Sequence, residues 1–225
     1  VLEQLAASEA VLTTDEKELG VALVDIGGGT TDFTVYERGS IWHTGVIAIG
    51  GDHFTTDLAV SLRTPIPDAE KLKQRAGCAL AALIDEEDMV EVSSVGGRAP
   101  RTMPKKILAE VLQPHAEEVF HHLWDEIRRS GYERSLNAGV VLTGGGSKLE
   151  GMAEIAEQIF DLPIRRGFPD GVGGLADHVQ DPSFATAVGL AMYVNGHDAA
   201  ALPSIGLGMF GDWRERFGRI LRDFF

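Results

Sequence analysis

The chain has 225 residues, of which 44% are hydrophobic and 24% charged, the composition of a globular protein with a buried core. Its formal net charge of −14 argues against a nucleic-acid binder, which needs a basic surface, and limits any contact with an anionic membrane to a local segment. The single cysteine, Cys78, excludes a disulfide framework within the chain.

The hydrophobic pattern of the first part predicts strands that alternate with helices, as in an α/β fold. Pro65 and Pro67 end the last helix of this part, because proline cannot continue a helix. In chain order the expected elements are a helix over 1–13, an acidic solvated turn over 15–18, a strand over 20–24 that ends at Asp25, a β-hairpin over 31–37 and 41–48, and a helix that follows Gly50-Gly51-Asp52 and ends before Pro65.

The rest of the chain continues the alternation. Pro114 lies inside the longest helical stripe and is expected to kink or split it. The region of about 55–135 separates two strand–turn–helix units, so we expect an inserted subdomain. The expected elements are a helix capped by Asp68 and running to about Ile84, a strand over 88–95, the stripe over 104–129, a strand over 139–142, a helix from Ser147 to about Phe160, a strand near Ile164 and a helix over 182–194.

A first glycine-rich turn, DIGGGTTDF, covers residues 25–33. Glycines at a strand end let backbone N–H groups converge on an anion, and threonine hydroxyls add further donors. The strand-end carboxylate would face the hydrated Mg²⁺ that accompanies a nucleoside triphosphate. The predicted nucleotide-binding residues of this turn are Asp25, Gly27, Gly28, Gly29, Thr30 and Thr31, with Asp25 bound to magnesium through water.

A second turn of the same layout, VVLTGGGSKLEGM, covers residues 140–152. A helix N-terminus attracts phosphate, and glycines there let a flat ring lie against the backbone. Either turn alone can also be a plain tight connection, since glycine is the usual residue at such turns. Neither matches the Walker or the dinucleotide fingerprint. The candidate residues here are Gly144, Gly145, Gly146, Ser147 and Lys148.

Together these segments resemble the actin superfamily. DIGGGTTDF is similar to its second phosphate motif, VVLTGGGSKLEGM to its adenosine motif, and VLEQLAASEAVLT and DPSFATAVGLAMY to its two connecting helices. The run LVDIGGGTTDFTVYERGSIWHTGVIAIGGDHFTTDLAVSLRTP, the following AEKLKQRAGCA and the C-terminal tail resemble the FtsA family of bacterial cell-division proteins in particular.

The resemblance implies an α/β, actin-like (ribonuclease H-like) domain half that binds ATP and Mg²⁺. It implies a subdomain 2A formed by residues 1–53 and 136–198, and an inserted α/β subdomain 2B over 54–135. Glu70 and Lys73 would contact the ribose and the adenine from the 2B side. From the residues alone they can equally be an ordinary solvated pair on a helix.

The family pattern is incomplete in this chain. A first phosphate motif and subdomains 1A and 1C are absent, and the chain opens at Val1, so we expect a fragment that carries one wall of a nucleotide cleft. Alone it should bind ATP poorly or not at all, and we expect at most a slow ATPase in the full-length protein. A smaller departure is Gln4, where the family often has proline.

The resemblance also implies partners. These are the C-terminal peptide of the tubulin-like protein FtsZ, other copies of the chain in a filament, and a membrane surface, but no nucleic acid. The family often has a basic residue after the helix proline, where this chain has His115, so the FtsZ contact is less certain here. Arg101 is the other candidate for it.

The tail over 209–225 predicts an amphipathic helix, preceded by a linker over 199–208. It is too short and too charged to cross a bilayer, so it is expected to lie in the interface of the cytoplasmic membrane, as a peripheral anchor at the division site. It can instead pack on the domain. The predicted membrane-facing residues are Trp213, Phe217, Ile220, Leu221, Phe224 and Phe225.

Two other classes remain open at this point. A sugar or acetate kinase relative shares the two glycine turns but has no use for an amphipathic tail. Another actin-like assembly protein, similar to PilM or MreB, also shares the turns. MreB usually places its membrane contact elsewhere, so the C-terminal helix is the feature that distinguishes the FtsA resemblance from this alternative.

Overall fold

The computed structural model describes residues 2–171 and 179–198. By its internal contacts the chain divides into two units, Val1–Met192 and Tyr193–Phe225. Every element except the last part of helix α8 lies in the first unit. The predicted linker over 199–208 and the predicted amphipathic helix over 209–225 lie outside the described residues.

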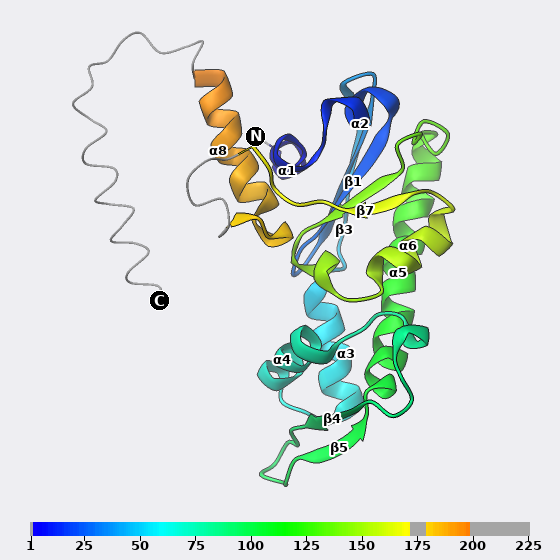
Figure 1. Ribbon diagram of the computed structural model, residues 1–225, viewed down its shortest axis with the longest axis vertical. Coiled ribbons are helices and arrows are strands. Elements are labelled where there is room, and N and C mark those ends of the chain that lie inside the picture. Colours follow the sequence, from blue (N-terminus) through cyan, green and yellow to red (C-terminus); the bar gives the residue numbers. More distant parts are fainter. Residues whose placement is uncertain (1, 172–178, 199–225) are drawn as a thin grey trace, which may run out of the picture. The chain divides into compact units, whose positions relative to one another are not determined.

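A five-stranded sheet with the strand order β3-β2-β1-β6-β7 forms the centre of the first unit (Figure 1). The pairs β1–β2 and β2–β3 are antiparallel, as the predicted hairpin requires, whereas β6 and β7 run parallel to β1. The ends of β1 and β6 therefore meet, and Asp25 lies opposite Thr143. The strands are β1 Val21–Ile26, β2 Thr31–Glu37, β3 Ser40–Ile47, β6 Val140–Thr143 and β7 Ile164–Arg166.

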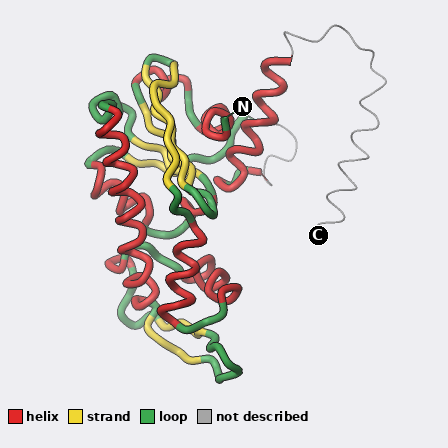
Figure 2. The backbone as a smooth tube through the Cα atoms, turned by 180° about the vertical axis from the view of Figure 1, so that it is seen from behind, coloured by secondary structure: helices red, strands yellow, loops and turns green. Residues whose placement is uncertain are grey.

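Helices cover both faces of the sheet (Figure 2). Successive strand residues point to opposite faces, and β1 has buried apolar residues on both, so each face packs against helices. Val21 and Leu23 pack in a cluster with α1 (Glu3–Val11) and the start of α8 (Ala185–Asp198). Their neighbours Ala22 and Val24 pack on the other face, with α5 (Lys106–Ser130) and α6 (Met152–Phe160). The predicted α/β class is confirmed.

The region between β3 and β6 adds helices and a small second sheet below the first in Figure 1. Its hydrophobic side chains join the same buried cluster as the α5/α6 face of the main sheet. The boundaries predicted for subdomains 2A and 2B stay a prediction. The elements are α3 Gly51–Leu62, α4 Ile66–Ala76, the 3₁₀ helix η1 Ala81–Leu83, and the antiparallel pair β4 Met89–Val92 and β5 Arg101–Pro104.

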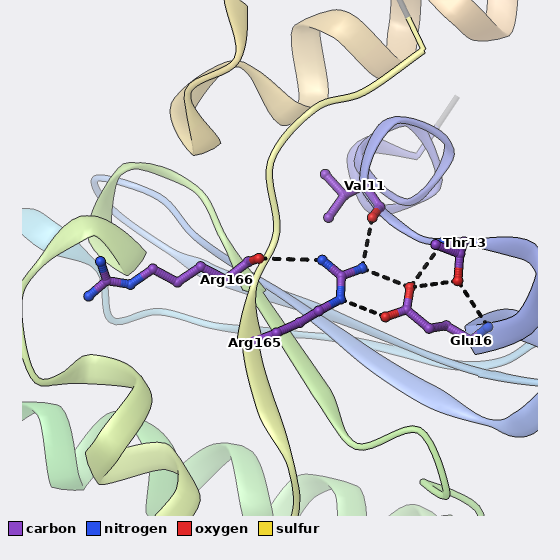
Figure 3. A network of polar contacts seen from close by, with 5 residues as sticks. All are labelled: Val11, Thr13, Glu16, Arg165 and Arg166. Atoms are coloured by element: carbon purple, nitrogen blue, oxygen red, sulfur yellow. Dashed lines mark hydrogen bonds and ion pairs between the residues drawn. The ribbon is translucent and has the colours of Figure 1, made fainter.

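The acidic turn predicted over 15–18 is wrong, because these residues belong to helix α2, Thr14–Leu19. Thr13 and Glu16 form a capping box at its start. The Glu16 carboxylate also accepts two hydrogen bonds from the guanidinium of Arg165 on the edge strand β7 (Figure 3). The Nε–Oε1 distance is 2.6 Å and the Nη2–Oε2 distance is 2.7 Å. Burial raises the pKa of Glu16, but Arg165 and Thr13 outweigh it, and the net pKa is lowered.

Three further expectations about helix ends are wrong. Helix α4 begins at Ile66 with Pro65 as its N-cap, not Asp68, and it ends at Ala76, because Gly77 takes an extended backbone. The predicted helix at Ser147 is first a 3₁₀ turn, η2 (Gly145–Lys148), and α6 follows only after Gly151, whose φ is +85°.

Pro114 does not split the long stripe, since α5 is one helix from Lys106 to Ser130. Residues on both sides of the proline are fully buried, among them Leu112 and Ala116. Tertiary packing thus outweighs the loss of one helix hydrogen bond.

Candidate nucleotide cleft

The two glycine turns border one cleft of about 560 Å³, which is within the size range of small-molecule sites. The turns that follow β1 and β6 line one side of the cleft, and residues of α3 and α4 line the other side. The lining residues are Gly27, Gly28, Gly51, Asp52, Phe54, Glu70, Lys73, Gln74, Arg75, Gly77, Gly145, Gly146, Lys148, Leu149, Glu150 and Ser183.

The first turn is tied through its carbonyl groups to the start of α3. The Gly51 and Asp52 N–H groups donate to the carbonyls of Gly27 and Gly28, at 2.9 and 2.8 Å. Within the described residues, the N–H groups of Gly28 and Gly29 donate to no carbonyl, and both glycines are exposed. Unpaired N–H groups on an exposed turn are what an anion requires.

The second turn packs against the end of β1. Gly144 has φ +82°, and a Cβ there would lie 2.2 Å from Asp25 Oδ1. A Cβ at Gly146 would lie 2.3 Å from Ile26 Cγ2. Ser147 is buried and its hydroxyl donates to the Gly144 carbonyl at 2.7 Å, so this hydroxyl holds the turn rather than facing the cleft.

Lys148 lines the cleft and pairs with Asp181, which lies just before the 3₁₀ helix η3 (Pro182–Phe184). The Asp181 carboxylate also accepts bonds from the Ser183 N–H and hydroxyl, at 3.0 and 2.6 Å. Partial burial raises the pKa of Asp181, but Lys148 and Ser183 outweigh it and lower that pKa to about 2. The pair links the second turn to the segment that leads into α8.

Glu70 and Lys73 form a compact cluster with Thr55 and Gln74. Lys73 Nζ contacts the Gly51 carbonyl at 2.8 Å, Thr55 Oγ1 at 2.8 Å and Glu70 Oε2 at 2.7 Å, which uses all three ammonium protons. Gln74 donates to Glu70 Oε1 at 2.7 Å. Burial raises the pKa of Glu70, but these partners outweigh it and lower the net pKa, so Glu70 is an ionised acceptor facing the cleft.

Asp25 lies behind the first turn, on the sheet face covered by α1 and α8. Thr186 on α8 donates to Asp25 Oδ2 at 2.9 Å, and Asp32 lies directly opposite on β2. Burial raises the pKa of Asp25; Thr186 opposes this, and the charges of Asp32 and Glu3 add to it. In the described part of the chain no three His, Cys, Asp or Glu side chains group around a metal position. One strand-end carboxylate nevertheless suits Mg²⁺, which keeps most of its waters.

The structure thus brings part of the predicted nucleotide site together. Gly27, Gly28, Glu70, Lys73, Gly145, Gly146 and Lys148 line one cleft. The other predicted residues, Asp25, Gly29, Thr30, Thr31, Gly144 and Ser147, do not line it. Thr31 is fully buried and its hydroxyl donates to the Ile49 carbonyl at 2.8 Å, while the exposed Thr30 donates to Asp32 at 2.9 Å.

Neither of the two candidates for the FtsZ contact lines the cleft, although His115 packs on the lining residue Phe54. Arg101 on β5 donates to the Leu62 carbonyl at the end of α3. The His115 side chain is only 14% exposed, pairs with Asp57 at 3.0 Å and stacks on His53. Both side chains therefore have internal partners, and their role in partner binding stays a prediction.

Sequence reasoning missed several lining residues. Gln74 lies one helical turn after Glu70, so the i,i+4 spacing could have revealed it. Leu149 lies within the second glycine-rich segment and Asp52 directly follows Gly51, but residue type alone gave no signal for either of them. Gln4 was noted only as a departure, although its amide contacts Asp32 at 2.7 Å.

Comparison with known proteins identifies the family. The family model described as "Cell division protein FtsA" matches residues 22–189. The chain belongs to the FtsA family. The FtsA of Pseudomonas aeruginosa is 53% identical over 193 residues, which cover 86% of this chain and 46% of that protein. The Escherichia coli K12 FtsA is 42% identical over 230 residues, which cover 97% of this chain and 54% of that protein.

The chain therefore spans about half the length of these FtsA relatives. Membership in the family confirms the resemblance found in the sequence and sets the kinase, PilM and MreB alternatives aside.

Solved structures confirm the actin-like fold. MreB5 of Spiroplasma citri bound to ADP matches with a TM-score of 0.67 at 18% identity, covering 87% of this chain and 59% of that one. A MamK double helical filament matches with a TM-score of 0.63 at 17% identity, covering 89% and 59%. Among the described helices, none has the length and apolar character of a membrane-spanning segment.

Proposed function

We propose that the chain forms one wall of the ATP site of an FtsA-type division protein that links FtsZ filaments to the cytoplasmic membrane. The observation that carries this proposal is the convergence of both glycine turns, Glu70 and Lys148 on a single cleft in a chain of the FtsA family. The MreB5 structure with ADP is of a protein with the same fold, which supports a nucleotide as the ligand.

Different roles are proposed for the residues that line the cleft and for Gly29 and Asp25, which belong to the first turn but do not line the cleft. The exposed N–H groups of Gly28 and Gly29 would receive phosphate, and Asp25 would hold the water shell of Mg²⁺. Gly145 and Gly146 would lie against the adenosine. The ionised Glu70 would accept a ribose hydroxyl, whereas Lys73 must exchange one of its three present bonds to reach a ligand.

The wider role rests on the family and on the tail. The apolar face predicted over 209–225 would lie in the membrane interface, and many copies in one filament would anchor by avidity. The MamK match is a filament of a protein with this fold, which supports self-association. We place the protein at the cytoplasmic face of the membrane at the division site, with ATP controlling assembly rather than fast turnover.

Nucleotide binding is tested in a chimera in which this chain replaces the matching 46% of the P. aeruginosa relative. We expect titration with a fluorescent ADP analogue and Mg²⁺ to saturate, and Glu70→Gln to weaken binding. Glu126→Gln is the matched control, since Glu126 pairs with Arg129 on an exposed part of α5 and does not line the cleft. Equal effects of the two substitutions would remove Glu70 from the site, and no saturation would overturn the nucleotide proposal.

The membrane role is tested by co-sedimentation with anionic vesicles, comparing this chain with one that ends at Gly208. We expect only the longer chain to pellet. If neither pellets, the tail is not an anchor, while the nucleotide proposal keeps its own test.

A further inference from the structure

Two acidic residues occupy an unfavourable position at the end of the first β-hairpin. Asp25 and Asp32 are directly opposite each other across β1 and β2. Like charges at such a cross-strand pair destabilise a sheet. A fold that keeps this pair must supply donors to both carboxylates, or gain something from holding them close together.

The donors come from two different helices. Gln4, in the first turn of α1, is buried and donates from Nε2 to Asp32 Oδ1 at 2.7 Å. Thr186, at the start of α8, donates to Asp25 Oδ2 at 2.9 Å. Thr30 supplies a second donor to Asp32, through Oδ2 at 2.9 Å.

These bonds fix the direction of each carboxylate. Asp25 is fixed further by Gly144, whose backbone approaches so closely that a Cβ there would lie 2.2 Å from Asp25 Oδ1. Asp32 belongs to the segment that follows the exposed glycines of the first turn. Both carboxylates therefore lie at the base of the turn proposed to receive phosphate, on the α1/α8 side of the sheet.

We propose that Gln4 and Thr186 are positioning residues for the metal side of the nucleotide site. Gln4 orients Asp32 and Thr186 orients Asp25, so that the two carboxylates together accept hydrogen bonds from the water shell of one Mg²⁺. The cation offsets the repulsion between them, which gives the fold a reason to keep the pair. This inference rests on the proposed nucleotide function and adds to it a role for two residues outside both glycine turns.

The test separates the magnesium-linked part of binding from the rest. In the chimera, ATP affinity is measured with Mg²⁺ and with EDTA, and the ratio of the two dissociation constants is the readout. We expect Gln4→Leu and Thr186→Val, which remove one donor each, to reduce that ratio by roughly five- to tenfold. Affinity in EDTA should stay unchanged.

Gln74→Leu is the matched control, because Gln74 also donates to a carboxylate at 2.7 Å but lines the cleft on the α4 side. It should change both affinities by the same factor. If the unsubstituted chimera binds no ATP in either condition, the proposed nucleotide function fails and this inference with it. If the chimera binds but both Gln4→Leu and Thr186→Val keep the full magnesium ratio, this inference alone is overturned.

Folding is checked by the circular dichroism melting curve of each variant. Should Gln4→Leu fail to fold, Thr186→Val decides the outcome, since it acts on the other carboxylate from another helix and keeps the side-chain volume.

Discussion

The two glycine turns have nearly the same sequence pattern but need their glycines for different reasons. At Gly29 in the first turn, no atom lies within 4 Å of where a Cβ would stand, and at Gly28 the nearest is 3.6 Å away. At Gly144 and Gly146 in the second, a Cβ would lie 2.2 and 2.3 Å from atoms of β1. The first turn keeps its backbone open to a ligand, whereas the second lets two strand ends pack closely.

This difference bears on how such motifs are interpreted. The possibility that a glycine-rich turn is only a tight connection holds in part for the second turn, where packing already requires two of the three glycines. It does not account for Gly28 and Gly29, which are exposed and where an added Cβ would meet no atom closer than 3.6 Å. The ligand-binding interpretation is therefore stronger for the first turn than for the second.

The largest expected effect is on stability, in the second turn. Gly144→Ala should lower the free energy of unfolding by about 3 kcal/mol or more, because the methyl group meets Asp25 and the backbone has positive φ. Gly29→Ala, in open space, should cost less than ~1 kcal/mol. Urea denaturation of the two variants measures the contrast, and equal costs would contradict the packing explanation.

The next effect is on binding, in the first turn. Gly29→Ala in the chimera should weaken MgATP binding roughly tenfold, because the methyl group stands where phosphate would approach the backbone. The measurement is the same ligand titration, with the melting temperature as a check on folding. Unchanged affinity would show that the open side of this turn is not the phosphate side.

A smaller contrast concerns the buried hydroxyl in each turn. Thr31→Val leaves the Ile49 carbonyl without this donor and should cost about 1–2 kcal/mol. Ser147→Ala should cost less, about 1 kcal/mol or below, because the Gly144 carbonyl still accepts from the Ser147 N–H at 3.2 Å. Denaturant unfolding ranks the two, and the reverse order would contradict this assignment.

The smallest effect is expected at Lys148 and Asp181. The pKa of Asp181 is lowered to about 2, below the ordinary value of 3.8 for an aspartate, so its contribution to stability is complete above about pH 4 and is lost as the pH falls toward 2. The side chains of Lys148 and Asp181 are 51% and 34% exposed, so solvent screens the pair and Asp181→Asn should cost ~0.5 kcal/mol or less at pH 7. Unfolding at pH 7 and pH 3 should show a difference between variant and parent that shrinks with acidity.

Much of the fold follows from local patterns in the sequence. The apolar runs before Asp25 and Thr143 are buried strands, and the turn at Arg38 and Gly39 joins the predicted hairpin, with φ +51° and +72°. These features depend on residues close in sequence. The start of α6 was missed because Gly151, in the left-handed region, separates η2 from the helix.

Long-range contacts could not be predicted in the same way. The capping box at Thr13 and Glu16 was present in the sequence, but the second partner of Glu16 is Arg165, 149 residues away. The bond from Gln4 to Asp32 depends on the packing of α1 against the sheet, and Thr186 reaches Asp25 from 161 residues away. The glycine turns were found from the sequence, whereas the side chains that orient their neighbours required the fold.

The tip of the β4–β5 hairpin has a practical use. Gly96 and Gly97 both have positive φ, and no atom lies within 4 Å of where a Cβ would stand at either position. Strand pairing from Met89–Pro104 to Val92–Arg101 closes the hairpin below them. Both glycines are also exposed, so a fluorescent protein inserted between them offers a way to image the protein in dividing cells with both chain ends left free.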